Sequence, residues 1–502
     1  MTVKPTLDDV KLVLSYTGKV VIGVAILLVI PMLTAVAAGE WDCLVYFALS
    51  LGISLSTGFL LAALGATDRK AGWMHGMVTG GLSWIVVMAV AALPYWFSGH
   101  YLSYLDAMFD VMSGFTTTGL VLIQDLDHVA TSLNMWRHLL TFVGGQGVIV
   151  LALTFLVKDS GGGYKLYVGE GKDERLFPSI FHTAKAIWKI SLAYLAVGTL
   201  ALWAAGIAIG LPVGDAFLHG LWVYMAAWST GGFAPMSQNI LYYHSALYEG
   251  ITVVFFILGS FNFALHNAVW SGNRKEIARN IETASFATTM SILTLVTCWG
   301  LMKLRVYPDL AALVRKGFYQ LASAHTTTGF MTIYPRQLAN EWGDLAVLAM
   351  IVAMLIGGSA CSTAGGFKGL RVGIIWKALV QETRKLLKPG SAVFAQRFHY
   401  HGEKNLSESQ VRSAALIVIM YVAIFFFATL AGCAAGYPLL ESAFESASVT
   451  GNVGFSIGVT QAAMPSFLKV VYIFNMWAGR LEFMAVLATF AFIAAFFRRK
   501  QA

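Results

Sequence analysis

Ten long apolar stretches constrain the fold of this chain more than any other feature. A helix needs about 20 mostly apolar residues to cross roughly 30 Å of hydrocarbon. Stretches of this kind lie near 19–38, 43–65, 72–97, 135–157, 187–211, 245–271, 283–303, 344–380, 411–435 and 466–497. Only 12% of the 502 residues are charged, about half the share of a soluble domain. The sequence therefore predicts an all-α polytopic membrane protein and excludes a soluble enzyme, a disordered chain and a nucleic-acid binder.

The placement of lysine and arginine predicts the orientation in the membrane. If both termini are cytoplasmic, 26 of the 34 basic residues fall on the cytoplasmic side, as the positive-inside rule requires. The opposite orientation would invert this bias. Half of the 26 acidic residues then lie in outer segments. This pattern either predicts a negative outer mouth that attracts cations or follows by default from the positive-inside bias.

Four similar segments recur between the spans, and we call them the glycine segments: 113–120, 226–233, 323–330 and 448–455. Each follows a short apolar run and ends in a glycine before a large apolar residue; these glycines are Gly119, Gly232, Gly329 and Gly454. A second glycine follows inside a full span in each copy, at Gly144, Gly259, Gly357 and Gly479. Internal repeats of this kind indicate one structural unit used four times.

The unit is predicted to be a helix, a short pore helix, a glycine segment and a second helix. Four pseudo-symmetric units would surround a central pore, with two extra N-terminal helices outside them. The predicted division is 1–70 for the extra helices, 71–157 for repeat 1, 158–186 for a basic cytoplasmic loop, 187–271 for repeat 2, 272–380 for repeat 3 with a broken gating helix, 381–410 for a second cytoplasmic loop and 411–502 for repeat 4.

Extended backbone at membrane depth is tolerated only where it lines a cavity or is buried in protein. Four such segments around one axis can turn carbonyl oxygens inward and replace the hydration shell of a cation. Glycine permits the backbone conformation that this requires. The residues predicted to bind the ion are Thr117, Thr118, Gly119, Thr230, Gly231, Gly232, Thr327, Thr328, Gly329, Asn452, Val453 and Gly454. Helix packing is the alternative, although packing glycines belong inside spans.

These segments, the two extra helices and the long basic loop resemble the Trk/Ktr/HKT superfamily of potassium transporters, specifically its bacterial TrkH branch. The resemblance implies potassium uptake across the bacterial cytoplasmic membrane, because all four segments carry the glycine. It also implies a homodimer docked on a cytosolic nucleotide-binding ring of RCK type that senses ATP, ADP or NADH. We expect that ring to contact 158–186 and 381–410. Gly231 and Asn452 depart from the other segments and leave the degree of potassium over sodium preference open.

The eighth span is interrupted by ten small residues, 357–366, which we call the small-residue segment. Four glycines make it a poor helix interior, since each costs about 1 kcal/mol relative to alanine. It is either a packing face or, as the resemblance implies, an intramembrane loop that gates the pore. The predicted gate residues are Gly357, Gly358, Ser359, Ser362, Thr363, Gly365, Gly366 and Arg480. Arg480 lies inside the last span, where a charge usually faces the bundle interior; we expect it to repel cations from the closed pore.

A channel-like potassium uptake protein is the leading functional prediction. The alternatives are a sodium- or proton-coupled potassium symporter, for which Glu482 is the candidate acid, and a less selective potassium and sodium transporter. An enzyme is disfavoured because the sequence lacks metalloprotease and nucleophile-elbow motifs. No cofactor is predicted in this chain. His325 could sense pH or be hydrogen-bonded in its pore helix, while Gln146 and Asn262 either line the pore or cross-link helices.

Overall fold

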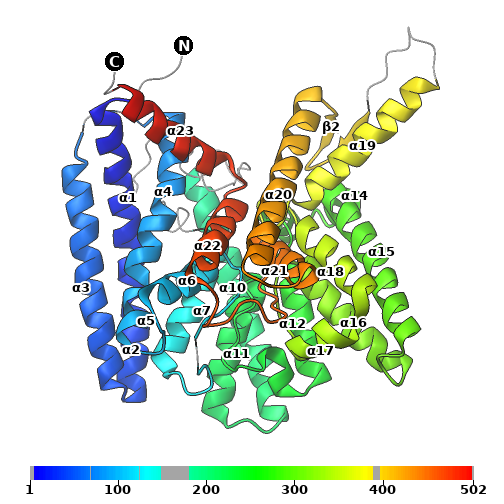
Figure 1. The fold of residues 1–502 in the computed structure, drawn as a ribbon, viewed down its shortest axis with the longest axis horizontal. Coiled ribbons are helices and arrows are strands. Elements are labelled where there is room, and N and C mark those ends of the chain that lie inside the picture. Colours follow the sequence, from blue (N-terminus) through cyan, green and yellow to red (C-terminus); the bar gives the residue numbers. More distant parts are fainter. Residues whose placement is uncertain are drawn as a thin grey trace.

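The computed structural model describes residues 5–67, 69, 71–123, 125–147, 180–387 and 396–499. The described chain is helical apart from one antiparallel hairpin, β1 (Arg397–His399) with β2 (Glu403–Asn405). The helix α1 begins, α23 ends and the hairpin lies at the same end of the molecule (Figure 1). We call this end the hairpin end. The structure confirms a helical polytopic membrane fold.

The N-terminal addition is one helical hairpin. The helix α1 (Leu7–Leu27) continues into α2 (Val29–Ala38), and α3 (Trp41–Leu64) returns beside them at one edge of the molecule (Figure 1). The first span begins at Leu7, well before the predicted residue 19, because Thr6 and Asp9 form a capping box. Glycines let α1 and α3 approach closely: a Cβ on Gly18 would lie 2.5 Å from the Gly58 oxygen.

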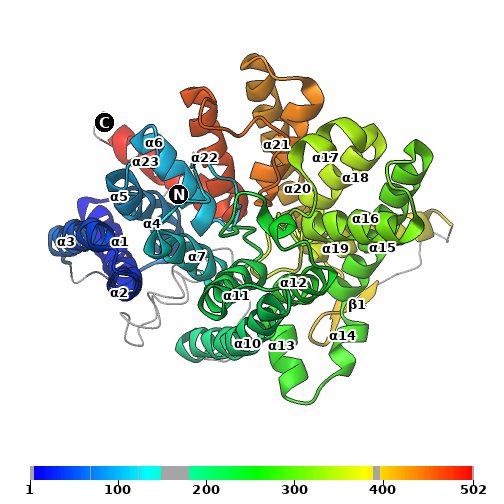
Figure 2. The same cartoon turned by 90° about the horizontal axis from the view of Figure 1, so that it is seen from below.

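The rest of the chain forms four units that follow one another around a centre (Figure 2). In each unit a long helix precedes a short one, a glycine segment and a further helix. The first unit contains α4 (Trp73–Ala91), α5 (Leu93–Phe97), α6 (Tyr104–Phe115) and α7 (Thr131–Gln146). The second contains α10 (Ile180–Ala208), α11 (Val213–Trp228), the 3-10 helix η1 (Asn239–Tyr243), α12 (Ala246–Gly259) and α13 (Phe263–Trp270).

The third unit follows α14 (Lys275–Arg279) and contains α15 (Ile281–Leu304), α16 (Leu310–His325), α17 (Pro335–Glu341), α18 (Gly343–Ile356) and α19 (Gly369–Leu386). The fourth contains α20 (Glu408–Ala434), α21 (Leu439–Gly451), α22 (Ser466–Arg480) and α23 (Met484–Arg499). Large apolar side chains such as Leu295, Phe426 and Leu430 are exposed on the outer helices. Such faces are expected where lipid replaces water.

Several predicted spans are bent or divided. Among the described residues, six straight helices are long and apolar enough to cross a membrane. The predicted spans 245–271 and 466–497 bend by 100° and 112°, between α12 and α13 and between α22 and α23. The span 344–380 is divided into α18 and α19 by the small-residue segment. Residues 148–157 of the fourth span and 158–179 of the basic loop lie outside the described residues, as do 388–395 of the second loop.

The acidic residues predicted for a negative outer mouth are partly withdrawn from solvent. Asp106, Asp110, Glu249 and Glu445 are all buried. Glu249 accepts hydrogen bonds from Arg315 and Lys316, and Asp106 accepts one from Lys469. Because α6, α21 and the start of α12 are packed within the protein, these carboxylates are withdrawn from solvent, and the count of outer charges overstates the field that they contribute.

Candidate functional site

The four short helices α6, α11, α16 and α21 end in the same backbone motif. The residue before each segment glycine donates its N–H to the carbonyl five residues earlier, and the distance is 2.8 Å in every copy: Thr118 to Ser113, Gly231 to Ala226, Thr328 to Ser323 and Val453 to Ser448. The intervening residue has a left-handed backbone, with φ of 56° at Thr117, 50° at Thr230, 56° at Thr327 and 55° at Asn452. This is a Schellman-type helix end, repeated four times.

Left-handed backbone explains why Asn452 differs from the three threonines. A β-branched residue at positive φ is a strained outlier, whereas asparagine is enriched in this region. The Asn452 amide also donates to Thr118 Oγ1 at 3.1 Å and to the Met476 carbonyl at 2.9 Å. Asn452 therefore relieves local strain and ties the fourth segment to the first.

The four segment glycines form a closed ring of backbone contacts. A Cβ placed on each glycine would meet the carbonyl oxygen of the residue before the glycine in the next repeat. These separations are 2.6 Å from Gly119 to Gly231 O, 2.1 Å from Gly232 to Thr328 O, 1.9 Å from Gly329 to Val453 O and 2.0 Å from Gly454 to Thr118 O. All four glycines have positive φ. The order of contacts, from repeat 1 to 2, 3, 4 and back to 1, places the segments around one axis.

The glycine at position 231, where the first and third segments have threonine, is explained by the side chain of Thr141. A Cβ on Gly231 would lie 1.8 Å from Thr141 Oγ1, which comes from α7 of the preceding repeat. The Thr141 hydroxyl lies 3.2 Å from Ser229 Oγ and fills the space that a side chain at 231 would occupy. The departure at Gly231 is therefore compensated by a larger residue from the adjacent repeat.

The small-residue segment touches all four glycine segments at residues that precede their glycines. Thr363 Oγ1 lies 3.3 Å from Thr230 Oγ1, and the Thr363 carbonyl accepts from Thr117 Oγ1 at 3.5 Å. The Gly365 N–H donates to Thr327 Oγ1 at 2.7 Å. A Cβ on Gly365 would lie 2.0 Å from the Gly451 oxygen. This loop consequently lies across the inner face of the ring.

The segment is held in place by hydrogen bonds to backbone carbonyls at the bend between α12 and α13. The Ser359 N–H donates to the Ser260 carbonyl at 2.9 Å, and Thr363 Oγ1 donates to the Gly259 carbonyl at 2.8 Å. Gly357 and Gly366 have φ of 73° and 72° at the two ends of the loop. Ser362 caps its turn by donating to the Ser359 carbonyl, and Gly358 packs against Ser260.

Two basic side chains accompany the segment. Arg480 donates to the Thr363 carbonyl, to Thr117 Oγ1 at 3.2 Å and to the Gly144 carbonyl at 2.9 Å. Lys368, which sequence analysis assigned to the cytoplasm, is buried and donates to the Ala364 carbonyl. Its position directly after an apolar run concealed this placement. The guanidinium of Arg480 and the ammonium of Lys368, both beside the segment, disfavour a cation at that point.

Sequence analysis missed a set of polar residues that hold the chain just after the segment glycines. Nine residues before the segment glycine, Asp110 accepts from the Leu122 N–H at 2.7 Å. The equivalent Glu445 accepts from the N–H groups of Ile457 and Val459 at 3.0 and 3.1 Å. Gln320, in the same register, donates to Thr332 Oγ1. A polar residue at this fixed spacing in three apolar helices is the signal that could have found them.

The remaining polar candidates have structural partners. His325 Nε2 lies 2.7 Å from Thr289 Oγ1, and Gln146 Oε1 accepts from Ser191 Oγ at 2.8 Å. Asn262 caps α13, and Glu482 forms an ion pair with Arg371 where α22 bends into α23. Among the described residues, no group of three or more His, Cys, Asp or Glu side chains could hold a metal ion.

The fold and site together define a multi-pass helical membrane protein built from four similar units, each with a short helix that ends in a glycine segment. Residues 52–498 match the family model TrkH, described as a cation transport protein. The chain belongs to the TrkH family of cation transport proteins.

Relatives and one solved structure support this assignment. An uncharacterized cation transporter of Methanocaldococcus jannaschii is 30% identical over 97% of this chain and 96% of its own length. The Trk system potassium uptake protein TrkH of Escherichia coli K12 is 30% identical over 82% of this chain and 83% of its own. The crystal structure of the potassium transporter TrkH from Vibrio parahaemolyticus matches with a TM-score of 0.79 and 26% identity, covering 95% of this chain and 98% of that one.

Proposed function

We propose that this protein takes up potassium through a pore whose selectivity filter is the ring of four glycine segments. The closed order of contacts among the four segment glycines carries the proposal. Short helices ending at the ring direct the negative ends of their dipoles toward its axis, which favours cations over anions. Carbonyl rings of this kind can replace the hydration shell of potassium. The proposed ion-binding residues are the twelve predicted from the sequence.

Potassium is favoured over other cations by two observations. Several relatives are named potassium uptake proteins. In addition, each of the four segments has its glycine at positive φ and in contact with the backbone of the next segment. All four repeats therefore contribute the same backbone geometry to the ring. The alternative is a less selective pore that admits both potassium and sodium. Competition between the two ions distinguishes it from a potassium-selective pore.

The small-residue segment is the proposed gate. Its contacts with Thr117, Thr230 and Thr327 lie across the inner face of the ring, and the charges of Arg480 and Lys368 oppose a cation there. Flux then requires the segment to leave this position. Extended backbone at membrane depth can move more readily than a helix because few of its own hydrogen bonds must break.

Uptake follows the membrane potential in this proposal, at about 2.3 kcal/mol per charge per 100 mV. The symport alternative relied on Glu482 as a coupling acid. The ion pair between Glu482 and Arg371 gives that carboxylate a structural partner at the bend between α22 and α23, which favours the uncoupled mechanism.

The membrane setting and partners complete the proposal. Both chain termini face the cytoplasm of a bacterial inner membrane, as the distribution of basic residues favours. Two copies form a homodimer that contacts a cytosolic nucleotide-binding ring of RCK type through 158–186 and 381–410. The basic C-terminal turn of α19, with Arg384 and Lys385, supports contact with an acidic partner at that face.

Flux of ⁸⁶Rb⁺ into liposomes that hold the purified protein tests the function. Competition by K⁺ and not by Na⁺, with uptake that follows an imposed potential, is expected. If uptake requires a Na⁺ or H⁺ gradient, the mechanism is symport and the uncoupled pore is refuted. Equal competition by Na⁺ would support the less selective pore.

A further inference from the structure

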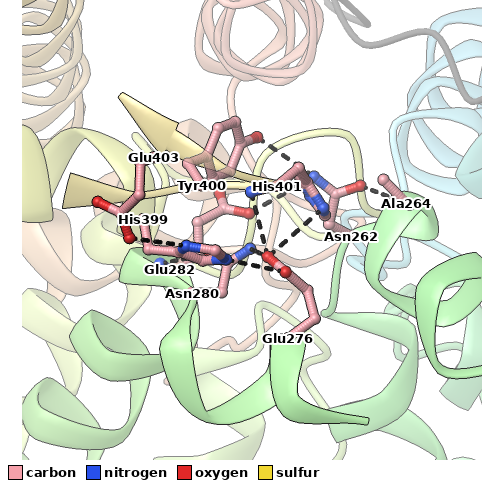
Figure 3. Close-up of polar contacts among 9 residues, drawn as sticks. All are labelled: Asn262, Ala264, Glu276, Asn280, Glu282, His399, Tyr400, His401 and Glu403. Carbon is pink, nitrogen blue, oxygen red and sulfur yellow. Dashed lines mark hydrogen bonds and ion pairs between the residues drawn. The ribbon is translucent and has the colours of Figure 1, made fainter. Parts of the chain in front are cut away.

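A buried carboxylate connects the small-residue segment to the hairpin end of the molecule. Glu282 lies in the first turn of α15 and is 2% exposed. Its Oε1 accepts the Ala360 N–H, within the segment, at 2.6 Å. Its Oε2 lies 3.5 Å from Asn262 Nδ2, and Asn262 begins α13. One side chain thus joins α15, the bend of repeat 2 and the proposed gate. Figure 3 shows Glu282 and Asn262 beside the hairpin residues.

A second buried carboxylate anchors the hairpin to the same helix start. Glu276 of α14 accepts from the His401 N–H at 3.1 Å and lies 2.9 Å from His399 Nε2. It also accepts from Asn280 Nδ2 at 3.1 Å, and Asn280 caps α15 by accepting the Glu282 N–H at 2.9 Å. The chain of hydrogen bonds therefore continues from β1 through Glu276 and Asn280 to Glu282.

Tyr400, at the turn of the hairpin, makes the second connection. Its hydroxyl lies 3.3 Å from Asn262 Nδ2. Its ring packs in a small apolar cluster with Phe398 and Ile281, and Leu370 joins this cluster from the first turn of α19. Since α19 begins directly after the small-residue segment, the hairpin contacts the chain on the far side of the gate as well.

Burial of the Glu282 carboxylate is unfavourable unless its oxygens accept hydrogen bonds, and one of these comes from the small-residue segment. A buried carboxylate loses its hydration, and charge-assisted hydrogen bonds are needed to offset that loss. Here one of those bonds goes to a backbone N–H in a loop whose two ends are glycines at positive φ. A network that only joined helices would not need this contact.

We propose that Glu282 is a positioning residue that holds the small-residue segment beneath the filter, and that the hairpin 397–405 sets the strength of this hold from the cytoplasmic side. The inference rests on the proposed gate. It predicts that a binding event which displaces the hairpin is transmitted to the segment through Glu276, Asn280 and Asn262.

Cys361 lies in the small-residue segment and is only 8% exposed. Its thiol should therefore react faster when the segment leaves its position, which makes it a reporter of that movement. The experiment uses the full-length protein with Cys43, Cys298 and Cys433 changed to serine, reconstituted in liposomes. The rate at which a water-soluble maleimide labels Cys361 is measured together with ⁸⁶Rb⁺ flux. The variants are Glu282→Ala, Glu282→Gln and Tyr400→Phe. Glu341→Gln is the matched control, because Glu341 is exposed at the end of α17 and accepts a hydrogen bond only from the nearby Gln337 among the contacts described for it.

Glu282→Ala is expected to speed labelling and raise flux at least tenfold, with K⁺ over Na⁺ competition unchanged because the ring is untouched. Glu282→Gln keeps an acceptor for Ala360 and should give a smaller rise, as should Tyr400→Phe. Labelling at the control rate in Glu282→Gln and Tyr400→Phe would overturn the inference even if Glu282→Ala failed to fold. Faster labelling without greater flux would retain the role of Glu282 and refute the gate.

Discussion

Neutralising Arg480 tests whether charge helps to close the pore. Its guanidinium lies 3.2 Å from Thr117 Oγ1, so an ion held by that hydroxyl would lie about 6 Å from the charge. At an effective dielectric constant of about 20, the repulsion between two unit charges at that distance is about 3 kcal/mol. Removing it should raise the ion's occupancy beside Thr117 by roughly a hundredfold, since 1.4 kcal/mol corresponds to tenfold.

The assay compares Arg480→Gln with Arg480→Lys in liposomes at equal protein density. Arg480→Gln should increase ⁸⁶Rb⁺ flux about ten- to a hundredfold. Arg480→Lys keeps the charge and loses the planar fork, and should increase flux much less. Unchanged flux in monodisperse Arg480→Gln protein would refute the electrostatic reasoning. Equal increases in both variants would assign the effect to lost hydrogen bonds.

Three further predictions follow from the same contacts. Gly329→Ala should abolish K⁺ preference because its Cβ would lie 1.9 Å from the Val453 oxygen, whereas Gly52→Ala, with open space around it, should leave competition unchanged. Gly231→Ala should lower the melting temperature, and adding Thr141→Ala should restore it by removing the hydroxyl at 1.8 Å. Hydrogen bonds to Glu276 and Glu403 raise the pKa of His399. The charged contact between His399 and Glu276, which anchors the hairpin, is therefore present at low pH and lost as pH rises through that pKa. Flux should therefore increase as pH rises through the pKa of His399, which lies above its ordinary value of about 6.5, and His399→Asn should remove this dependence.

Hydropathy and repetition were sufficient to predict the fold class. Apolar stretches identify spans because no water is available to backbone groups in lipid. The recurrence of the glycine segments indicated four units, and the left-handed residues at Thr117, Thr230, Thr327 and Asn452 show the same local geometry in each. Local sequence carries this information because a helix end is formed by residues close together in the chain.

Contacts between distant residues could not be predicted. Nothing in the local sequence links Glu282 with Ala360, or Thr141 with Gly231, because these pairs meet only through tertiary packing. The bends at Ser260 and Leu481 were also missed, because a few polar residues inside an apolar stretch indicate a buried site but do not by themselves indicate a bend. The burial of Lys368 and Glu445 was not expected for a related reason: a charge at the edge of an apolar run is assumed to be solvated until its partners are known.

Locating a bound ion tests the central claim most directly. Crystals of the protein grown in Rb⁺ give an anomalous signal that marks the ion itself. The filter proposal predicts a peak on the axis enclosed by the carbonyl oxygens of Thr118, Gly231, Thr328 and Val453. Well-ordered glycine segments with no peak there, and a peak beside Glu482 instead, would contradict the filter and place ion binding at the bend of the last span.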